Sequence, residues 1–126
     1  MSEKKKAHIL QLAWAGGVFD ARISFPKTGY VMRFDIPDQS VAERFHSTVG
    51  VGTLFQRGKD VVNARVWVYY TTSSDDTREL ILTLAPFMSA GKLKKAGELV
   101  ARIERNPLWQ KKNPEKAASL VMAPVE

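Results

Sequence analysis

The sequence has no cysteine and only two histidines, His8 and His46. Without cysteine there can be no disulfide framework, thiolate zinc site or cysteine nucleophile. The two histidines lack metal-ligand spacing, which argues against a multi-histidine metal site. No apolar run reaches the roughly 20 residues that span a bilayer, and no cleavage site follows the charged start of the chain. We therefore expect a soluble, cytoplasmic protein without membrane contact.

Positive charge is the main compositional feature. The 126 residues fit a single domain, with a formal net charge of +6 and a pI of about 9.7. Such a charge suits a polyanionic partner, because each phosphate that Lys or Arg neutralises releases condensed counterions. The alternative is a basic surface that only maintains solubility.

Hydrophobic periodicity predicts alternating helices and hairpins. In order, the pattern indicates a helix over residues 7–19, strands over 20–26 and 30–36, a short helix at about 41–49, strands over 53–57 and 64–72, and helices over 77–84 and 93–105. Residues 1–6 form a basic tail, and residues 106–126 a loosely packed extension with one short helix at about 115–121. The order is typical of an α+β protein with an antiparallel sheet covered by helices on one side.

Gly16 and Gly17 lie together inside the first predicted helix. Glycine in a helix interior costs about 1 kcal/mol relative to alanine. Two in succession therefore need a reason, and the close approach of another helix is the obvious one.

Three segments resemble one known family. They are AGGVFDARISF at residues 15–25, GVGTL at residues 50–54, and LTLAPF at residues 82–87 with GKLKKA at residues 91–96. In this order and spacing they are similar to the signature helix, a strand start and the later helices of the LAGLIDADG homing endonucleases. The resemblance covers residues 7–105.

This resemblance implies an αββαββα(α) fold with a four-stranded antiparallel saddle sheet that lies in the DNA major groove. It also implies a homodimer, since the chain has one signature helix and family members pack two together. Trp14, Gly16 and Gly17 are then the expected dimer interface. The alternative for the glycines is a close contact inside one subunit.

The resemblance also bears on catalysis. Family members place an acid at the eighth motif position, where two carboxylates hold the divalent metal that activates water. Arg22 occupies that position here, and a permanently protonated arginine cannot bind Mg²⁺. Asp20 is either a relocated metal ligand or a capping carboxylate. We therefore expect no cofactor, with Mg²⁺ required only if Asp20 supports cleavage.

Strand alternation from Arg22, together with the family's lysine near the scissile phosphate, gives the residues expected to face DNA. They are Arg22, Ser24, Thr28, Arg33, Asp35, Arg57, Lys59, Arg65, Trp67, Tyr69, Lys92 and Lys94. Arg22 would clamp a phosphate or, alternatively, pair with Asp20 or Asp35. Trp67 and Tyr69 have an alternative as core residues.

The leading hypothesis is a catalytically inactive homodimer that binds duplex DNA sequence-specifically, as a regulator or architectural factor of a cell, a phage or a mobile element. The first alternative is an active or nicking endonuclease that uses divalent metal. The second is a protein-interaction module that kept only the fold.

Overall fold

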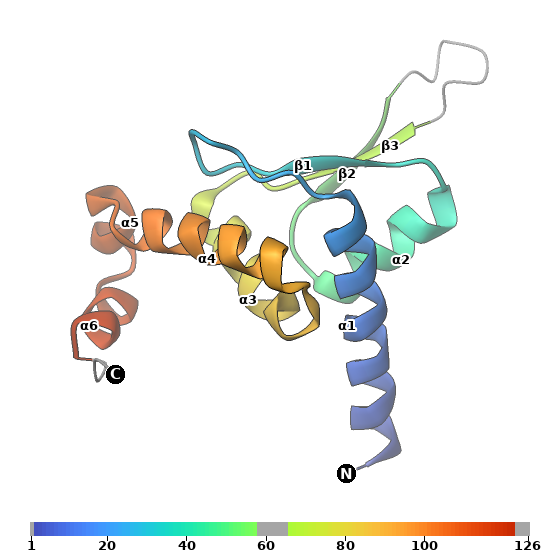
Figure 1. Ribbon diagram of the computed structural model, residues 1–126, viewed down its shortest axis with the longest axis horizontal. Coiled ribbons are helices and arrows are strands. Elements are labelled where there is room, and N and C mark those ends of the chain that lie inside the picture. The colour runs from blue at the N-terminus through green and yellow to red at the C-terminus, as the bar shows by residue number, and fades with distance from the viewer. Residues whose placement is uncertain (1, 58–65, 123–126) are drawn as a thin grey trace.

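The computed structural model describes residues 2–57 and 66–122, with side chains except those of residues 120–122. Its elements are α1 (Glu3–Arg22), β1 (Arg33–Ile36), α2 (Gln39–Val49), β2 (Thr53–Arg57), β3 (Val66–Tyr70), α3 (Ser74–Leu84), the short 3₁₀ helix η1 (Ala85–Phe87), α4 (Ala90–Glu104), α5 (Pro107–Lys112) and α6 (Pro114–Met122). Within these residues no helix is both long and apolar enough to cross a bilayer. The predicted α+β class, with helices gathered on one face of the sheet, is confirmed (Figure 1).

The sheet has three antiparallel strands in the order β1-β3-β2. The central strand β3 has the sequence VWVYY, and such β-branched and aromatic residues suit a pleated surface. The predicted fourth strand over residues 20–26 is not formed in the described part of the chain, because α1 continues to Arg22 and residues 24–32 run as a loop. Pro26 lies in this loop and has no N–H to give to a strand ladder.

An aromatic cluster joins the sheet to the helices. Phe19 of α1 meets Phe34 of β1 with ring centroids 5.8 Å apart, Phe34 meets Phe45 of α2 at 5.4 Å, and Phe45 meets Tyr69 of β3 at 4.9 Å. All three pairs have the edge-to-face geometry that aromatic rings prefer. Because the four rings come from four elements, this cluster fixes α1 and α2 against one face of the sheet.

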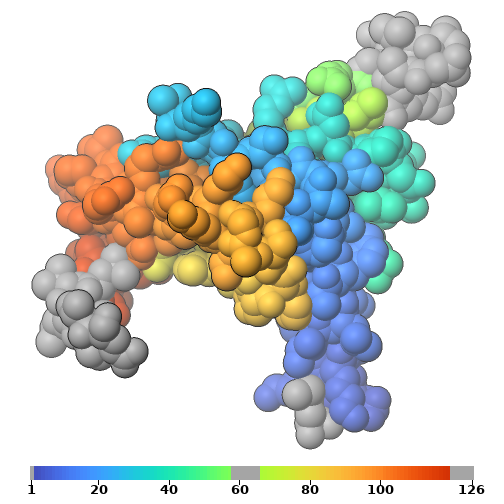
Figure 2. Space-filling model, viewed as in Figure 1, coloured from blue at the N-terminus to red at the C-terminus, as the bar shows by residue number. Residues whose placement is uncertain are grey.

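Helix α1 is longer than predicted and projects from the body (Figures 1 and 2). The Ser2 hydroxyl accepts a hydrogen bond from the Lys5 amide at 3.2 Å and so caps the helix. Residues 3–6 of the predicted basic tail therefore belong to α1. The side chains from Ser2 to Gln11 are exposed, so the first half of the helix is left uncovered by the rest of the described chain.

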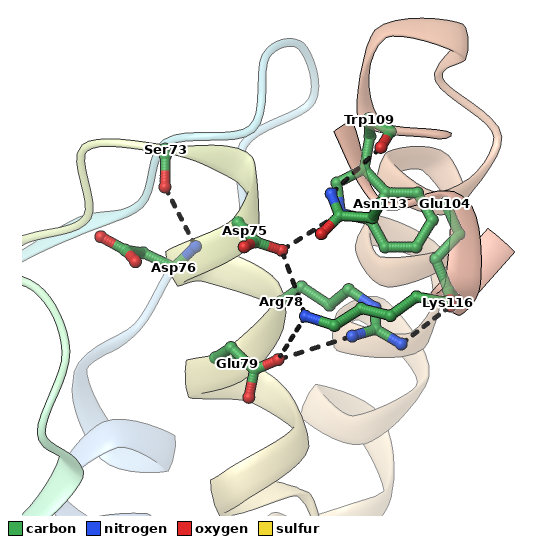
Figure 3. Close-up of polar contacts among 9 residues, drawn as sticks. All are labelled: Ser73, Asp75, Asp76, Arg78, Glu79, Glu104, Trp109, Asn113 and Lys116. Atoms are coloured by element: carbon green, nitrogen blue, oxygen red, sulfur yellow. Dashed lines mark hydrogen bonds and ion pairs between the residues drawn. The ribbon is translucent and has the colours of Figure 1, made fainter. Parts of the chain in front are cut away.

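The C-terminal extension begins with a packed helix, in contrast to the loose packing expected. Trp109 of α5 is only 3% exposed, and its indole Nε1 donates to Asp75 Oδ1 at 3.3 Å. The Arg78 guanidinium lies 5.1 Å from the centre of the Trp109 ring and pairs with Glu104 at 3.3 Å. Figure 3 shows how these contacts join α5 to α3 and α4.

Candidate nucleic-acid interface

The sheet turns one face away from the helices. Side chains alternate along a strand, so the residues between the buried Phe34, Ile36 and Tyr69 point to the opposite face. By strand register this open face carries Arg33, Asp35, Thr53, Phe55, Arg57, Val66, Val68 and Tyr70. No helix of the described residues covers this face in Figure 1. Arg33, Asp35 and Arg57 were predicted to face DNA, and the structure puts them on this face.

One ion pair crosses the open face. The Arg57 guanidinium lies 2.8 Å from Asp35 Oδ2. Arg57 belongs to β2 and Asp35 to β1, and β3 lies between these strands, so the pair passes above the central strand. Val68 of β3 is the register partner of Asp35 and is fully buried. Both charged side chains are about half exposed, so the pair adds little stability, but it neutralises one arginine of the open face.

A shallow hollow lies where α1 ends beside β1. It is lined by Ala21, Arg22, Ser24, Arg33, Phe34 and Asp35, so four of the predicted DNA contacts meet here. Arg22 is exposed in the last turn of α1, where a cation also complements the helix dipole. Within the described chain, neither Arg22 nor Arg33 has an ion-pair partner, so the pairing of Arg22 with Asp20 or Asp35 is not formed. The hollow therefore presents two uncompensated guanidinium groups.

The Asp20 carboxylate holds the start of α4. Its Oδ1 accepts a hydrogen bond from the Ser89 amide at 2.8 Å and another from the Ser89 hydroxyl at 2.9 Å. Ser89 is the N-cap residue of α4. Asp20 thus has the capping role that was the alternative to metal binding, but toward a segment 69 residues away.

These residues do not fit a divalent metal. Among residues 2–57 and 66–122, no three His, Asp or Glu side chains lie close enough together to hold one. Asp20 has one oxygen engaged by two donors, and Arg22 follows it at the end of the helix. A fixed cation there opposes the charge of a metal ion. The exposed charge that the described chain presents at this point is therefore positive.

The sequence did not show which of Lys92 and Lys94 corresponds to the family's lysine near the scissile phosphate. The two differ in their contacts. The Lys92 ammonium donates to the carbonyl of Ile23, the C-cap residue of α1, and a lysine in this place satisfies a free helix-end carbonyl. Lys94 is exposed on α4. Only Lys94 is therefore free to reach a phosphate without giving up a contact within the protein.

The loop after α1 is held by an arginine that the sequence did not single out. The Arg102 guanidinium, from α4, donates to the backbone carbonyls of Pro26 at 3.2 Å, Lys27 at 3.0 Å and Gly29 at 2.6 Å. Ser24 and Thr28, two predicted DNA contacts, are exposed on this loop. In the sequence Arg102 resembles any other surface arginine of a helix, because its partners lie more than 70 residues away.

The structure reverses the side of the sheet on which alternate residues of β3 were predicted to lie. Tyr69 lies opposite Phe34 and Leu54 in register and is fully buried, with its hydroxyl donating to the Val51 carbonyl at 2.7 Å. Burial, and secondarily the charge of Asp76, raises the pKa of Tyr69 above its ordinary value. Trp67 is half-buried on the same inner face.

Both aromatics therefore belong to the core side, which was their alternative, and Val66 and Tyr70 take their places on the open face. Two further predicted DNA contacts, Lys59 and Arg65, lie outside the described residues.

The predicted dimer residues occupy different faces of α1. A Cβ added to Gly16 would lie 2.5 Å from the Phe87 Cβ, so this glycine allows a close contact inside the subunit, as in the alternative reading. A Cβ on Gly17 would meet nothing within 4 Å. The Trp14 ring is half-buried, with the Arg44 guanidinium 3.9 Å from its centre. Only Gly17 keeps an open helix face.

Solved structures share this fold. A homing endonuclease, I-CvuI, in complex with the I-CreI target has a TM-score of 0.57 and 15% identity over 77% of this chain and 67% of its own. The archaeal intron-encoded homing endonuclease I-Vdi141I, complexed with DNA, has a TM-score of 0.52 and 18% identity over 94% of this chain and 86% of its own. No protein-family profile matches the sequence, and no curated protein matches it either. The homing-endonuclease fold is therefore established through structure.

Proposed function

We propose that this protein binds duplex DNA as a homodimer, through the open sheet face and the arginines at the end of α1, and does not cut it. The observation that carries the proposal is the hollow in which Arg22 and Arg33 lie exposed without carboxylate partners in the described chain. Two guanidinium groups so placed suit phosphate oxygens, to which arginine donates in a charge-assisted, often bidentate manner.

The shape of the sheet and the partners of its structural neighbours support DNA as the ligand. The major groove is wide enough for a two-stranded ribbon, and the open face of β2 and β3 offers one. I-CvuI and I-Vdi141I were both crystallised with DNA. The net charge of +6 also favours a polyanion.

Helix α1 supports the homodimer. Leu10, Gly17 and Ala21 are exposed, and their spacing of seven and four residues puts them on one side of the helix. Leu10 is 69% exposed. Small residues allow two helices to approach closely, so a second α1 would cover Leu10 and bring the two hollows together along one duplex.

The residues at the family's catalytic position favour DNA binding without cleavage. Arg22 supplies a cation where metal would need a carboxylate, and Asp20 is engaged by Ser89. A dimer with this arrangement grips two phosphate backbones without activating water. Such a protein would act as a regulator or an architectural factor.

A mobility-shift titration at several salt concentrations tests DNA binding. We expect binding to a random-sequence duplex at low salt and a steep loss of affinity as salt rises. Arg22→Gln and Arg33→Gln should each weaken binding and lower the salt slope by about one. Lys5→Gln is the matched control, because it removes the same charge at the projecting end of α1. No binding to any duplex at low salt would overturn the proposal and favour a protein-interaction module.

A plasmid incubation tests the absence of cleavage. We expect supercoiled plasmid to remain intact with Mg²⁺ or Mn²⁺ at protein concentrations that saturate the DNA. Nicking or cutting that Asp20→Asn abolishes would show that Asp20 is a metal ligand and that the protein is an endonuclease. Selection of bound sequences from a random pool would then reveal whether the binding is sequence-specific and whether the site is palindromic.

A further inference from the structure

The open sheet face carries an aromatic pair beside the Arg57–Asp35 ion pair. Phe55 of β2 and Tyr70 of β3 meet edge to face, with ring centroids 5.6 Å apart and planes at 69°. Phe55 is 40% exposed. Val66 and Val68 of β3 share this face, but Val68 is fully buried, so the accessible apolar surface comes mainly from Phe55 and Tyr70. A surface that reads base edges only through hydrogen bonds would need polar side chains here.

The charged groups of the open face lie beside the Phe55–Tyr70 pair. Arg33 stands beside Tyr70 in register, and Arg57 is occupied by Asp35. Thr53 and the hydroxyl of its register partner Tyr70 are the uncharged polar groups that the described strands add to this face. The arrangement therefore offers one uncompensated arginine, one ion pair and few uncharged hydrogen-bonding groups around the aromatic pair.

The major groove contains one apolar group that suits such a surface. Thymine presents its C5-methyl group there beside the O4 acceptor, whereas the other three bases present only hydrogen-bond donors and acceptors. We propose that this protein reads duplex DNA through the C5-methyl groups of pyrimidines, with Phe55, supported by Tyr70, as the contacting side chain. The inference rests on the proposed DNA-binding function and adds its base preference.

Charge favours DNA over a second copy of the chain as the occupant of this face. Two such faces packed against each other would confront Arg33 and its neighbour Arg22 with their own copies. A duplex instead places a phosphate backbone on each side of the groove, which arginines can contact, and base edges between them, which Phe55 and Tyr70 can contact.

Binding to paired synthetic duplexes tests the inference directly. An alternating A-T duplex is compared with the same duplex containing deoxyuridine for thymidine, and an alternating G-C duplex with its 5-methylcytosine form. Each pair differs only in the C5-methyl group. We expect tighter binding to the methylated member of both pairs, by about fourfold for each methyl group that becomes buried.

Variants separate the methyl preference from general DNA affinity. Phe55→Ala should remove most of the preference with little effect on the unmethylated duplexes, and Phe55→Leu should keep part of it. Arg57→Gln, the control on the same face, should change all four affinities by the same factor. Thermal melting followed by circular dichroism would check that each variant folds.

The outcomes distinguish this inference from the function on which it rests. Equal binding to both members of each pair by the unaltered protein overturns the methyl reading and leaves DNA binding intact. Failure to bind any of the four duplexes at low salt overturns both. If Phe55→Ala reduced self-association in analytical ultracentrifugation and left the methyl preference unchanged, the face would be an interface between copies instead.

Discussion

The two faces of the sheet differ in how much of their aromatic side chains is buried. Phe34 and Tyr69 on the inner face are 6% and 0% exposed and pack against rings from α1 and α2. Phe55, on the outer face, is 40% exposed and meets Tyr70 alone among the aromatic rings of the described chain. Alternate residues thus divide the packed core from the face on which DNA binding is proposed.

Helix α1 repeats this division at two adjacent glycines. Gly16 faces Phe87 inside the subunit, and Gly17 faces open space. Gly16 is required because Phe87 leaves no room for a side chain at this position. The outer glycine lies on the helix face where a second subunit is proposed.

The largest effect on stability should be the difference between alanine substitutions at Phe34 and at Phe55. Phe34→Ala should lower the free energy of unfolding by about 3–5 kcal/mol, because it leaves a cavity at the centre of the aromatic cluster. Phe55→Ala should change it by well under half as much, since that ring is already partly in water. Urea denaturation of the two variants measures the difference. Equal losses would mean that the outer face is also packed in solution.

Alanine substitutions at the two adjacent glycines should change the stability in opposite directions and by different amounts. Gly16→Ala should destabilise the protein by about 1–3 kcal/mol, because the new methyl group overlaps Phe87. Gly17→Ala should stabilise the isolated subunit by up to about 1 kcal/mol through helix propensity. If the dimer forms through this face, the same change should weaken it. Thermal unfolding and sedimentation at several concentrations would test both statements.

Local sequence signals predicted most elements of this fold. The caps and periodicity around α2, β2, β3 and α3 lie within a few residues of each element, so the sequence shows them directly. For example, Asp38 accepts from the Val41 amide and begins α2, as helix-start chemistry predicts. The strand predicted over residues 20–26 was wrong, because a few residues of alternating polarity are also compatible with the end of a helix.

The site was predictable in composition but not in its contacts. Strand alternation correctly put Arg33, Asp35 and Arg57 on one face. The parity of β3 failed because Trp67 and Tyr69 are amphipathic, and only the opposing Phe34 shows which side Tyr69 takes. The partners of Asp20 and Arg102 lie about 70 residues away, and no local pattern carries that information.

The buried hydroxyl of the inner face should give a smaller and pH-dependent effect. Tyr69→Phe should cost about 1 kcal/mol, because the Val51 carbonyl loses its donor. Burial raises the pKa of Tyr69 in the folded protein, so its contribution to stability is complete below pH 10, the ordinary tyrosine pKa. It is then lost progressively as pH rises further. Urea denaturation between pH 8 and 11 should show a steeper alkaline loss for the unaltered protein than for Tyr69→Phe.

The ion pair above β3 should give the smallest change in stability and the most direct test of the outer face. Asp35→Asn should lower the free energy of unfolding by at most about 1 kcal/mol, because both partners are about half exposed. It should also tighten DNA binding at low salt, since it frees Arg57 and removes a negative charge that faces the phosphates. Glu43→Gln removes the same charge from α2, away from the open face, and should raise affinity less. Weaker binding by Asp35→Asn would show instead that the carboxylate accepts from a base edge, such as the cytosine amino group, and that Arg57 needs Asp35 to hold its position.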